Sequence, residues 1–289
     1  MDTQKKKWKE FLQLLLSHRM GKIGLIIIIV FLLMAVFAPY LWTVNPYVSG
    51  EVENILVKPS SEFWLGTDDM GKDVWSQVVY GARVSIMIGF IAAIITVFTG
   101  AFIGIIAGYF GGKLEGVLMR IVDFFMMLPM LPLMIVLAAV LGPSIWNIVF
   151  VISVISWPTT ARVVRSQVLS LKERPFVEAA RCIGASNARI MFREILPNVV
   201  PLLFAQSILM VTITIYSEAV LSFLGLGDIS VISWGQMLHF AFESGAMSNS
   251  PWWVFPPILA IVLLIVSFTF LGTAVSDVLT PGYKEKRGY

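Results

Sequence analysis

The sequence VSIMIGFIAAIITVFTGAFIGIIAGYF occupies residues 84–110 and contains no charged side chain. A helix of about 20 such residues crosses the apolar interior of a bilayer, which is roughly 30 Å thick. The composition of the whole chain agrees, because 57% of its 289 residues are hydrophobic, only 13% are charged and the mean hydropathy is +0.84. Soluble domains carry about twice that share of charged residues. We therefore predict an integral membrane protein.

Five more apolar runs accompany this one, at residues 24–42, 124–141, 144–161, 199–224 and 252–276. The run 144–161 is the weakest, because polar residues and a proline dilute it. A membrane β-barrel would instead show alternating segments of about ten residues. The sequence thus predicts an all-α fold with six transmembrane helices.

The basic residues orient these helices. Of the 21 lysines and arginines, all but Lys58, Lys72 and Arg83 lie before the first run, between the second and third, between the fourth and fifth, or after the sixth. Six crossings place these four segments on one face, and an excess of Lys and Arg marks the cytoplasmic face. Both termini are therefore expected in the cytoplasm. The net charge of +3 reflects this topology and gives no support for nucleic-acid binding.

The residues before the first run have competing interpretations. A cleaved signal peptide fits poorly, because the apolar run exceeds the roughly 7 to 15 residues of a signal-peptide core, and Pro39 follows the candidate cleavage residue Ala38. Trp8, Phe11 and Leu15 lie at helical spacing, which is typical of an interfacial helix on membrane lipid. A solvated tail is the alternative.

Few groups in the sequence are suited to bond chemistry. Cys182 is the only cysteine, which excludes an internal disulfide, and we interpret it as a packing residue. The two histidines, His18 and His239, fall on opposite membrane faces in this topology, so no metal site is expected. The sequence also lacks the phosphate-binding G-x-x-x-x-G-K-[ST] motif. The chain is predicted not to be an enzyme, and energy for transport would come from another chain or an ion gradient.

A polar island lies between the fourth and fifth runs, where residues 178–198 read EAARCIGASNARIMFREILPN. Pro175 suits the first position of a helix, and Gly184 suits its end, because glycine readily adopts the left-handed conformation. Ser186 is a natural N-cap for a second short helix, which Pro197 would disrupt. We expect two helices of about ten residues each, a length at which isolated helices are marginal in water.

Helices this short need a partner surface to persist. The first presents Ala179 and Ala180 amid Glu178 and Arg181, a surface of small residues that another protein could approach closely. The spacing favours a docking element over a plain cytoplasmic connector.

The EAA triplet at 178–180, with Gly184 after three further residues and Leu-Pro at 196–197, resembles the EAA loop of permeases from ATP-binding-cassette (ABC) importers. In that family the loop forms a coupling helix that docks in a groove of the cytoplasmic ATPase. Glu194 stands where the family motif has isoleucine. The resemblance assigns ATPase coupling to Glu178, Ala179, Ala180, Arg181, Gly184 and Pro197.

A second resemblance narrows the subfamily. The sequence LGTDDMGKDVWSQVVYGARVS at 65–85 is similar to a segment of oligopeptide/dipeptide permease C-type subunits, with Lys72 and Gln77 where arginines are usual. SEAVLSFLGLG at 217–227 and SWGQML at 233–238 resemble the same group. The likeness implies a type I ABC-importer permease fold with cytoplasmic coupling helices, in the plasma (inner) membrane of a prokaryote.

The resemblance also implies partners and a division of the chain. The partners are a homologous second permease, two ATP-binding subunits that carry ATP and Mg, and an extracytoplasmic solute-binding protein. Peptides are the expected solute, with oligosaccharides or nickel chelates as alternatives.

The implied parts are an interfacial helix at 1–23, the first transmembrane helix and external loop at 24–83, the core permease domain at 84–276, which contains the coupling loop 162–198, and a cytoplasmic tail at 277–289.

Glu218 is the clear ionisable group deep within an apolar run, where desolvating a charge is costly. It lies toward the outer end of 199–224, where it would meet solute or the second permease, or else hydrogen-bond to a neighbouring helix. An ion-driven carrier would need paired ionisable or broken-helix sites at mid-membrane. A membrane-embedded enzyme would need several facing acidic or histidine residues. Neither pattern is present in the sequence, which favours the importer.

Two local patterns carry further structural predictions. Asp68, Asp69 and Asp73 lack the spacing of a calcium loop, so we expect them to cap a helix whose apolar residues within 74–79 lie on the membrane surface. Small residues recur at nearly helical intervals over 89–108 and predict a tight contact between helices.

Overall fold

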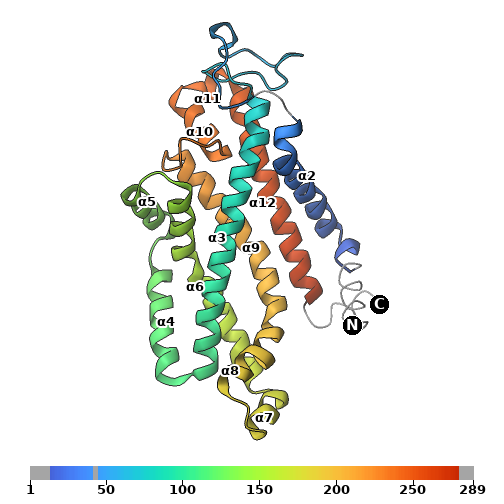
Figure 1. Ribbon diagram of the computed structural model, residues 1–289, viewed down its shortest axis with the longest axis vertical. Coiled ribbons are helices and arrows are strands. Elements are labelled where there is room, and N and C mark those ends of the chain that lie inside the picture. Colours follow the sequence, from blue (N-terminus) through green and yellow to red (C-terminus); the bar gives the residue numbers. More distant parts are fainter. Residues whose placement is uncertain (1–13, 42–44, 280–289) are drawn as a thin grey trace.

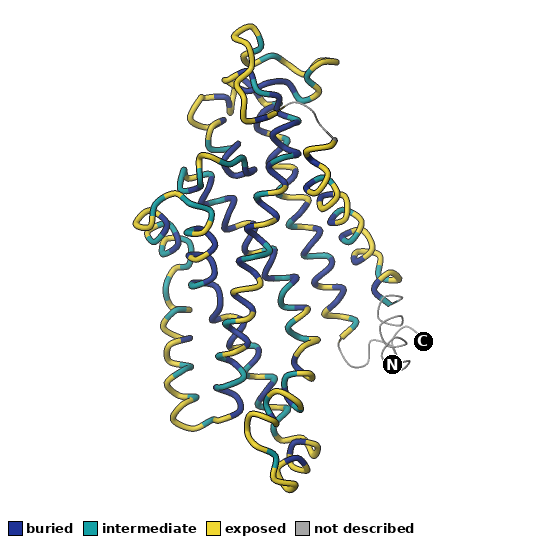
Figure 2. The backbone as a smooth tube through the Cα atoms, in the orientation of Figure 1, coloured by how far each residue is buried: buried dark blue, intermediate teal, exposed yellow. Residues whose placement is uncertain are grey.

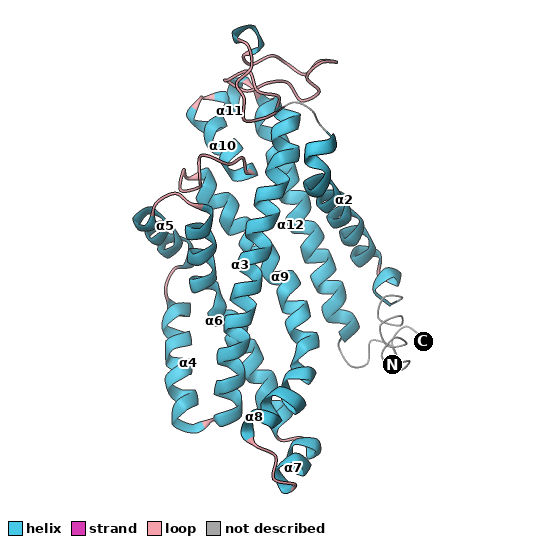
Figure 3. Ribbon diagram, viewed as in Figure 1, coloured by secondary structure: helices cyan, strands magenta, loops and turns pink. Residues whose placement is uncertain are grey.

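A computed structural model describes residues 14–41 and 45–279 (Figure 1). The long helices are α2 (Arg19–Leu41), α3 (Val74–Phe110), α6 (Ile145–Lys172), α9 (Leu196–Phe223) and α12 (Pro251–Leu279). The shorter ones are η1 (Val52–Asn54), α4 (Gly112–Met127), α5 (Met130–Leu141), α7 (Pro175–Cys182), α8 (Asn187–Arg189), the π-helix η2 (Ile190–Ile195), α10 (Trp234–Glu243) and α11 (Ala246–Asn249). The described residues form helices and loops without a strand, which confirms the all-α prediction (Figure 3).

Five of the described helices are long and apolar enough to cross a membrane, and α4 with α5 adds a sixth crossing when this bent pair counts as one span. α2 begins and α12 ends toward the end of the molecule that carries α7, as an even number of crossings requires (Figure 1). The expected tail boundary at 277 falls inside α12, which continues to Leu279. Most of the predicted interfacial helix, residues 1–13, lies outside the described residues, as does 280–289.

α3 lies at the centre of the bundle and packs against α6 along much of its length (Figure 1). The contact depends on glycines, because a Cβ atom at Gly100 would lie 2.6 Å from Thr160 Cβ, and one at Gly104 would lie 2.6 Å from the Ala161 carbonyl oxygen. Figure 2 shows buried residues along α3 and the facing side of α6. The predicted tight contact is thus confirmed, and it lies within this chain.

The third span, expected at 124–141, is bent where Pro129 and Pro132 interrupt its apolar run, as prolines in a helix allow. α4 ends at Met127, α5 begins at Met130, and the two are bent by 89°. Proline disfavours helical backbone in the residue before it, and Leu128, which precedes Pro129, is extended at φ −76° and ψ 138°.

The second short helix of the polar island starts as predicted, with Ser186 Oγ accepting from the Arg189 N–H at 3.3 Å, but its predicted end at Pro197 is wrong. α8, η2 and α9 follow one another without a break, so a single helical run extends over Asn187–Phe223. The turn before Pro197 is wide, since the Leu196 N–H donates to the Met191 carbonyl five residues back, and Pro197 then falls in the first turn of α9. A proline is tolerated there, because its missing N–H is not needed. The polar island is therefore continuous with the fifth span.

The external loop folds against the start of α3, at the end opposite α7. Asp73 caps α3 by accepting a hydrogen bond from the Ser76 N–H at 3.0 Å. Asp68 accepts from the Lys72 N–H at 2.8 Å and from Gln77 Nε2 at 2.7 Å. Burial raises the pKa of the Asp68 carboxyl. The capping prediction is confirmed for Asp73 alone, because Asp68 instead holds the loop together and ties it to Gln77 of α3.

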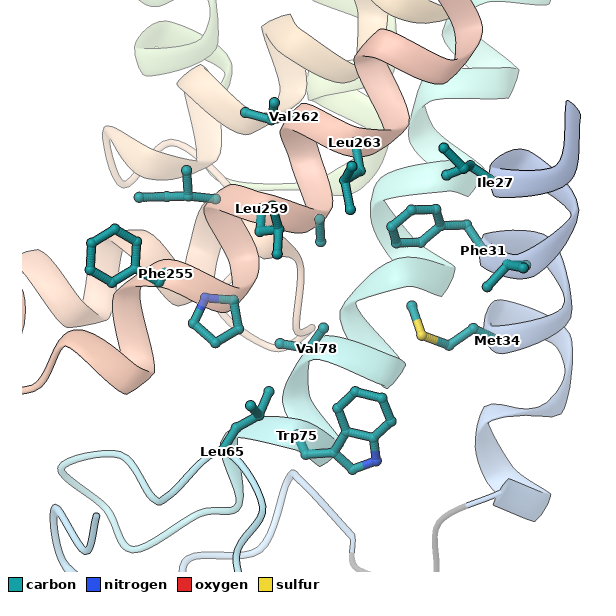
Figure 4. A pocket seen from close by; sticks show the side chains of 14 residues that line it. Ile27, Phe31, Met34, Leu65, Trp75, Val78, Phe255, Leu259, Val262 and Leu263 are labelled. Carbon is teal, nitrogen blue, oxygen red and sulfur yellow. The ribbon is translucent and has the colours of Figure 1, made fainter. Parts of the chain in front are cut away.

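Residues 74–79 form the first turns of α3, with Val74 and Val78 buried, so the prediction of a membrane-surface position is wrong. Trp75 lines a cavity of about 720 Å³ between α2, α3 and α12 (Figure 4). The side chains around it are hydrophobic except for the tryptophan N–H. The cavity therefore offers little hydrogen bonding to a polar solute.

The glycine contact between α3 and α6 predicts the effect of added bulk. Gly104→Val forces side-chain atoms into the α6 backbone, and such overpacking typically costs about 1–3 kcal/mol or more. We expect a thermal unfolding midpoint several degrees below wild type in detergent. Gly116→Val on α4 is the matched control, because a Cβ there meets nothing within 4 Å. Equal midpoints for the two variants would contradict the packing described.

Candidate functional site

α7 forms the tip of the molecule at one end of the bundle (Figure 1). Pro175 occupies its first turn, and Gly184 follows its end with φ +77°. The Ala185 N–H bonds to the Ala180 carbonyl at 3.0 Å, and the Gly184 N–H bonds to the Arg181 carbonyl at 2.9 Å. This pair of bonds is a Schellman ending, which requires the left-handed residue that glycine supplies. The predicted start and stop of the first short helix are confirmed.

One face of α7 packs into an apolar cluster at the junction of α3, α6, η2 and α9. Val177 is fully buried, and Ala180 is 8% exposed. The buried members of this anchor cluster are Ala101, Tyr109, Val164, Val168, Val177, Ala180, Ile190, Ile195 and Val199. Burial of apolar area contributes about 25 cal/mol per Å². The cluster therefore supplies the tertiary packing that so short a helix needs.

The opposite face of α7 is open to solvent. Glu178, Ala179 and Gly184 are exposed, and Ile183 is 79% exposed at the end of the helix. Ala180 is the predicted coupling residue that does not share this face, because it points into the anchor cluster. Pro197 lies apart from α7, exposed in the first turn of α9.

Arg181 has a partner within the chain. Its guanidinium carbon lies 5.9 Å from the centre of the Tyr109 ring, within range of a cation–π contact. The Tyr109 hydroxyl in turn donates to Asn187 Oδ1 at 2.8 Å. These contacts connect α7, α3 and α8. Sequence reasoning missed Tyr109 and Asn187, because a tyrosine ending an apolar run and an asparagine after an N-cap carry no signal of their contact.

Glu218 lies far from α7, about 30 Å along α9 from Pro197 at about 1.5 Å per residue. Its side chain is fully buried. The Ser222 hydroxyl donates to Oε1 at 2.9 Å, and the hydroxyls of Ser85 and Ser233 face the same carboxylate. In this conformation the carboxylate reaches no surface, and it joins α3, α9 and the start of α10 inside the chain.

The hydroxyls beside Glu218 also hold the N-terminus of α10. Ser233 Oγ accepts from the Gln236 N–H at 3.2 Å, and Ser85 Oγ accepts from the Trp234 N–H at 3.2 Å. Glu218 therefore lies where it can position α10. In the residues that the structure describes, no group of three or more His, Cys, Asp or Glu could hold a metal ion.

The geometry defines a class of protein, a polytopic helical membrane protein with a short exposed helix at one end that is packed against two of its spans. Residues 100–285 match the family described as binding-protein-dependent transport system inner membrane component. Residues 6–59 match the N-terminal TM domain of oligopeptide transport permease C. The chain therefore belongs to the family of binding-protein-dependent permeases, and it is a permease subunit of an ABC importer.

Curated relatives agree over nearly the whole length. The chain is 38% identical over 278 residues to the dipeptide transport system permease protein DppC of Alkalihalophilus pseudofirmus, covering 96% of this chain and 90% of that protein. It is 35% identical over 275 residues to the oligopeptide transport system permease protein OppC of Bacillus subtilis, covering 95% and 89%. The predicted family is confirmed.

A solved structure supports the fold. A chain of the MetNI methionine ABC transporter, in an inward-facing conformation, matches with a TM-score of 0.56 and 19% identity, covering 71% of this chain and 97% of that one. The type I importer permease fold is thus confirmed. The ATPase-coupling roles of residues on α7 stay predictions.

The burial of Glu218 leads to a test of its role. Glu218→Ala leaves a cavity and removes the acceptor of buried hydroxyls, and we expect it to lower the free energy of unfolding by about 2–4 kcal/mol. Glu218→Gln keeps the volume and one acceptor, and should cost less. Thermal unfolding followed by intrinsic tryptophan fluorescence measures both. Wild-type stability of the alanine variant, combined with lost transport, would instead support direct contact with solute or with a second permease.

Proposed function

We propose that the chain is one of two homologous permeases of a peptide importer in a prokaryotic inner membrane, with both termini in the cytoplasm. The names of its relatives, dipeptide and oligopeptide transport permeases, support peptides as the solute. Two ATP-binding subunits would supply ATP and Mg²⁺ chemistry from the cytoplasmic side, and a solute-binding protein would deliver peptide from outside. The chain itself carries out no bond chemistry in this proposal. Oligosaccharides or nickel chelates remain the alternative solutes.

The observation that carries the coupling role is the two-sided character of α7. Glu178, Ala179 and Gly184 face outward from the tip, where the small residues allow close approach of another protein surface. Val177 and Ala180 face inward and pack against the ends of α6 and α9. A subunit that binds the outer face of α7 is therefore connected, through the packing of α7, to two membrane spans.

The mechanism follows from this packing. Protein interiors are close-packed and transmit strain, so a displaced α7 displaces the side chains that enclose it. The ends of α6 and α9 then move with α7. ATP-driven closure of the two ATPase subunits would in this way change the relative tilt of the spans, and the path would open alternately to the two sides of the membrane. The free energy of ATP binding and hydrolysis would act by favouring one arrangement of the spans over the other.

Glu178 provides the sharpest test of coupling, because it is exposed and adjacent to the buried Val177. Glu178→Lys reverses the charge on the docking face without entering the anchor cluster. In the reconstituted complex we expect ATP-dependent uptake of a tripeptide to fall about ten-fold or more, since like charges across an interface cost several kcal/mol. Co-purification of the ATPase subunits is measured alongside uptake.

The matched control is Glu62→Lys, the same substitution at an exposed position of the external loop. It should leave ATPase co-purification and the ratio of ATP hydrolysed to peptide transported at wild-type values. Full uptake by the Glu178→Lys complex would remove the coupling role of α7. Uptake that is coupled normally but restricted to oligosaccharides or nickel chelates would remove only the choice of solute.

A further inference from the structure

The break between α4 and α5 leaves helix donors without partners. Pro129 is the N-cap of the 12-residue helix α5, and no side chain caps it among the described residues. The Leu133 N–H bonds back to the Pro129 carbonyl at 3.2 Å, while Pro132 has no N–H to offer. The N–H groups of Met130 and Leu131 are therefore the first-turn donors that lack a partner within the helix. They also lie at the positive end of the α5 dipole.

A cavity of about 150 Å³ adjoins this helix start, and its walls come from α4, α5, α6 and α9. Ser156 of α6 lines it, is 5% exposed, and has no hydrogen-bond partner for Oγ among the described residues. The neighbouring Ser153 differs, since its hydroxyl donates to the carbonyl oxygen of Val149, four residues back in the same helix, at 2.7 Å. Serines within helices often make this bond. A buried hydroxyl without a partner is costly. Ser156 and Met130, the first residue of α5, thus line the same cavity.

The same side of α4 and α6 carries exposed charges. Asp123 and Arg162 form an ion pair between the two helices, with side chains that are 56% and 50% exposed. Thr159, one turn before Arg162 on α6, is also exposed and lines the cavity. Charged groups avoid lipid. The exposed face of α2 differs, because its midpoint carries only apolar residues such as Ile29. The face that opens beside the cavity therefore adjoins water or protein.

We infer that the α4–α5 break and Ser156 form a subsite of the translocation path that hydrogen-bonds a carbonyl or carboxylate oxygen of the passing solute. The backbone N–H groups can only donate and the Ser156 hydroxyl can donate to the same atom, so an acceptor oxygen matches both. The volume suits one such group at a time. Met126, Met130 and Met210 also line the cavity, and methionine adapts to side chains of different shape. The inference rests on the proposed function, because a solute must pass here.

Removing the hydroxyl tests the subsite directly. Ser156→Ala in the reconstituted complex, supplied with binding protein, ATP and trialanine, should reduce the uptake rate ~5-fold, as expected for one hydrogen bond. Ser156→Thr keeps the hydroxyl, has room for its methyl group at the cavity, and should restore most of the rate. Wild-type uptake by Ser156→Ala would overturn the inference. So would equal loss in both variants, because the hydroxyl would then not be the cause.

Water access gives an independent measurement that needs no uptake. Thr159→Cys should react with a cationic, membrane-impermeant thiol reagent, and turnover with trialanine should slow the reaction. Ile29→Cys at the midpoint of α2 is the lipid-facing control and should stay unreactive. Peptide mapping by mass spectrometry separates either site from Cys182. Equal unreactivity of the two cysteines would overturn the inference, whereas a wild-type complex that hydrolyses ATP but moves no peptide would overturn the proposed function instead.

Discussion

The apolar contact beneath α7 is the interaction on which the rest of the structure depends. Val177 is fully enclosed by side chains from α6, η2 and α9, so a helix of eight residues is held in place although its length alone could not stabilise it. The same contact leaves Glu178 and Ala179 facing outward. Attachment on one face and exposure on the other make α7 both a docking surface and a part of the membrane bundle.

The helical run that begins beside α7 extends this connection across the bundle. The wide turn of η2 places Pro197 in the first turn of α9, so the chain continues as a helix from Asn187 to Phe223. Near its far end the carboxylate of Glu218 connects α9 to α3 and to the start of α10. One continuous helical run therefore connects the tip of the molecule with the opposite end of the bundle, and a movement at the tip can be transmitted along it.

Sequence reasoning predicted the features that depend on local chemistry. The apolar runs, the glycine contact of α3, the cap at Asp73 and the end of α7 at Gly184 each follow from a few neighbouring residues, and the structure confirms them. It failed in two other places. The proline rule misjudged Pro197, because a π-helix precedes it. No local pattern indicates the contact of Arg181 with Tyr109, because these residues lie 72 positions apart.

The most direct measurement of the central claim is the ratio of peptide uptake to ATP hydrolysis in a complex that carries Val177→Asp. This substitution places a carboxylate in the anchor cluster, where an unpaired charge is costly, and leaves the outward face of α7 unchanged. Val177→Ile keeps the site apolar and serves as the control. The account predicts that hydrolysis persists while uptake per ATP falls about ten-fold or more in the aspartate variant alone. Wild-type uptake per ATP with the aspartate in place would contradict it.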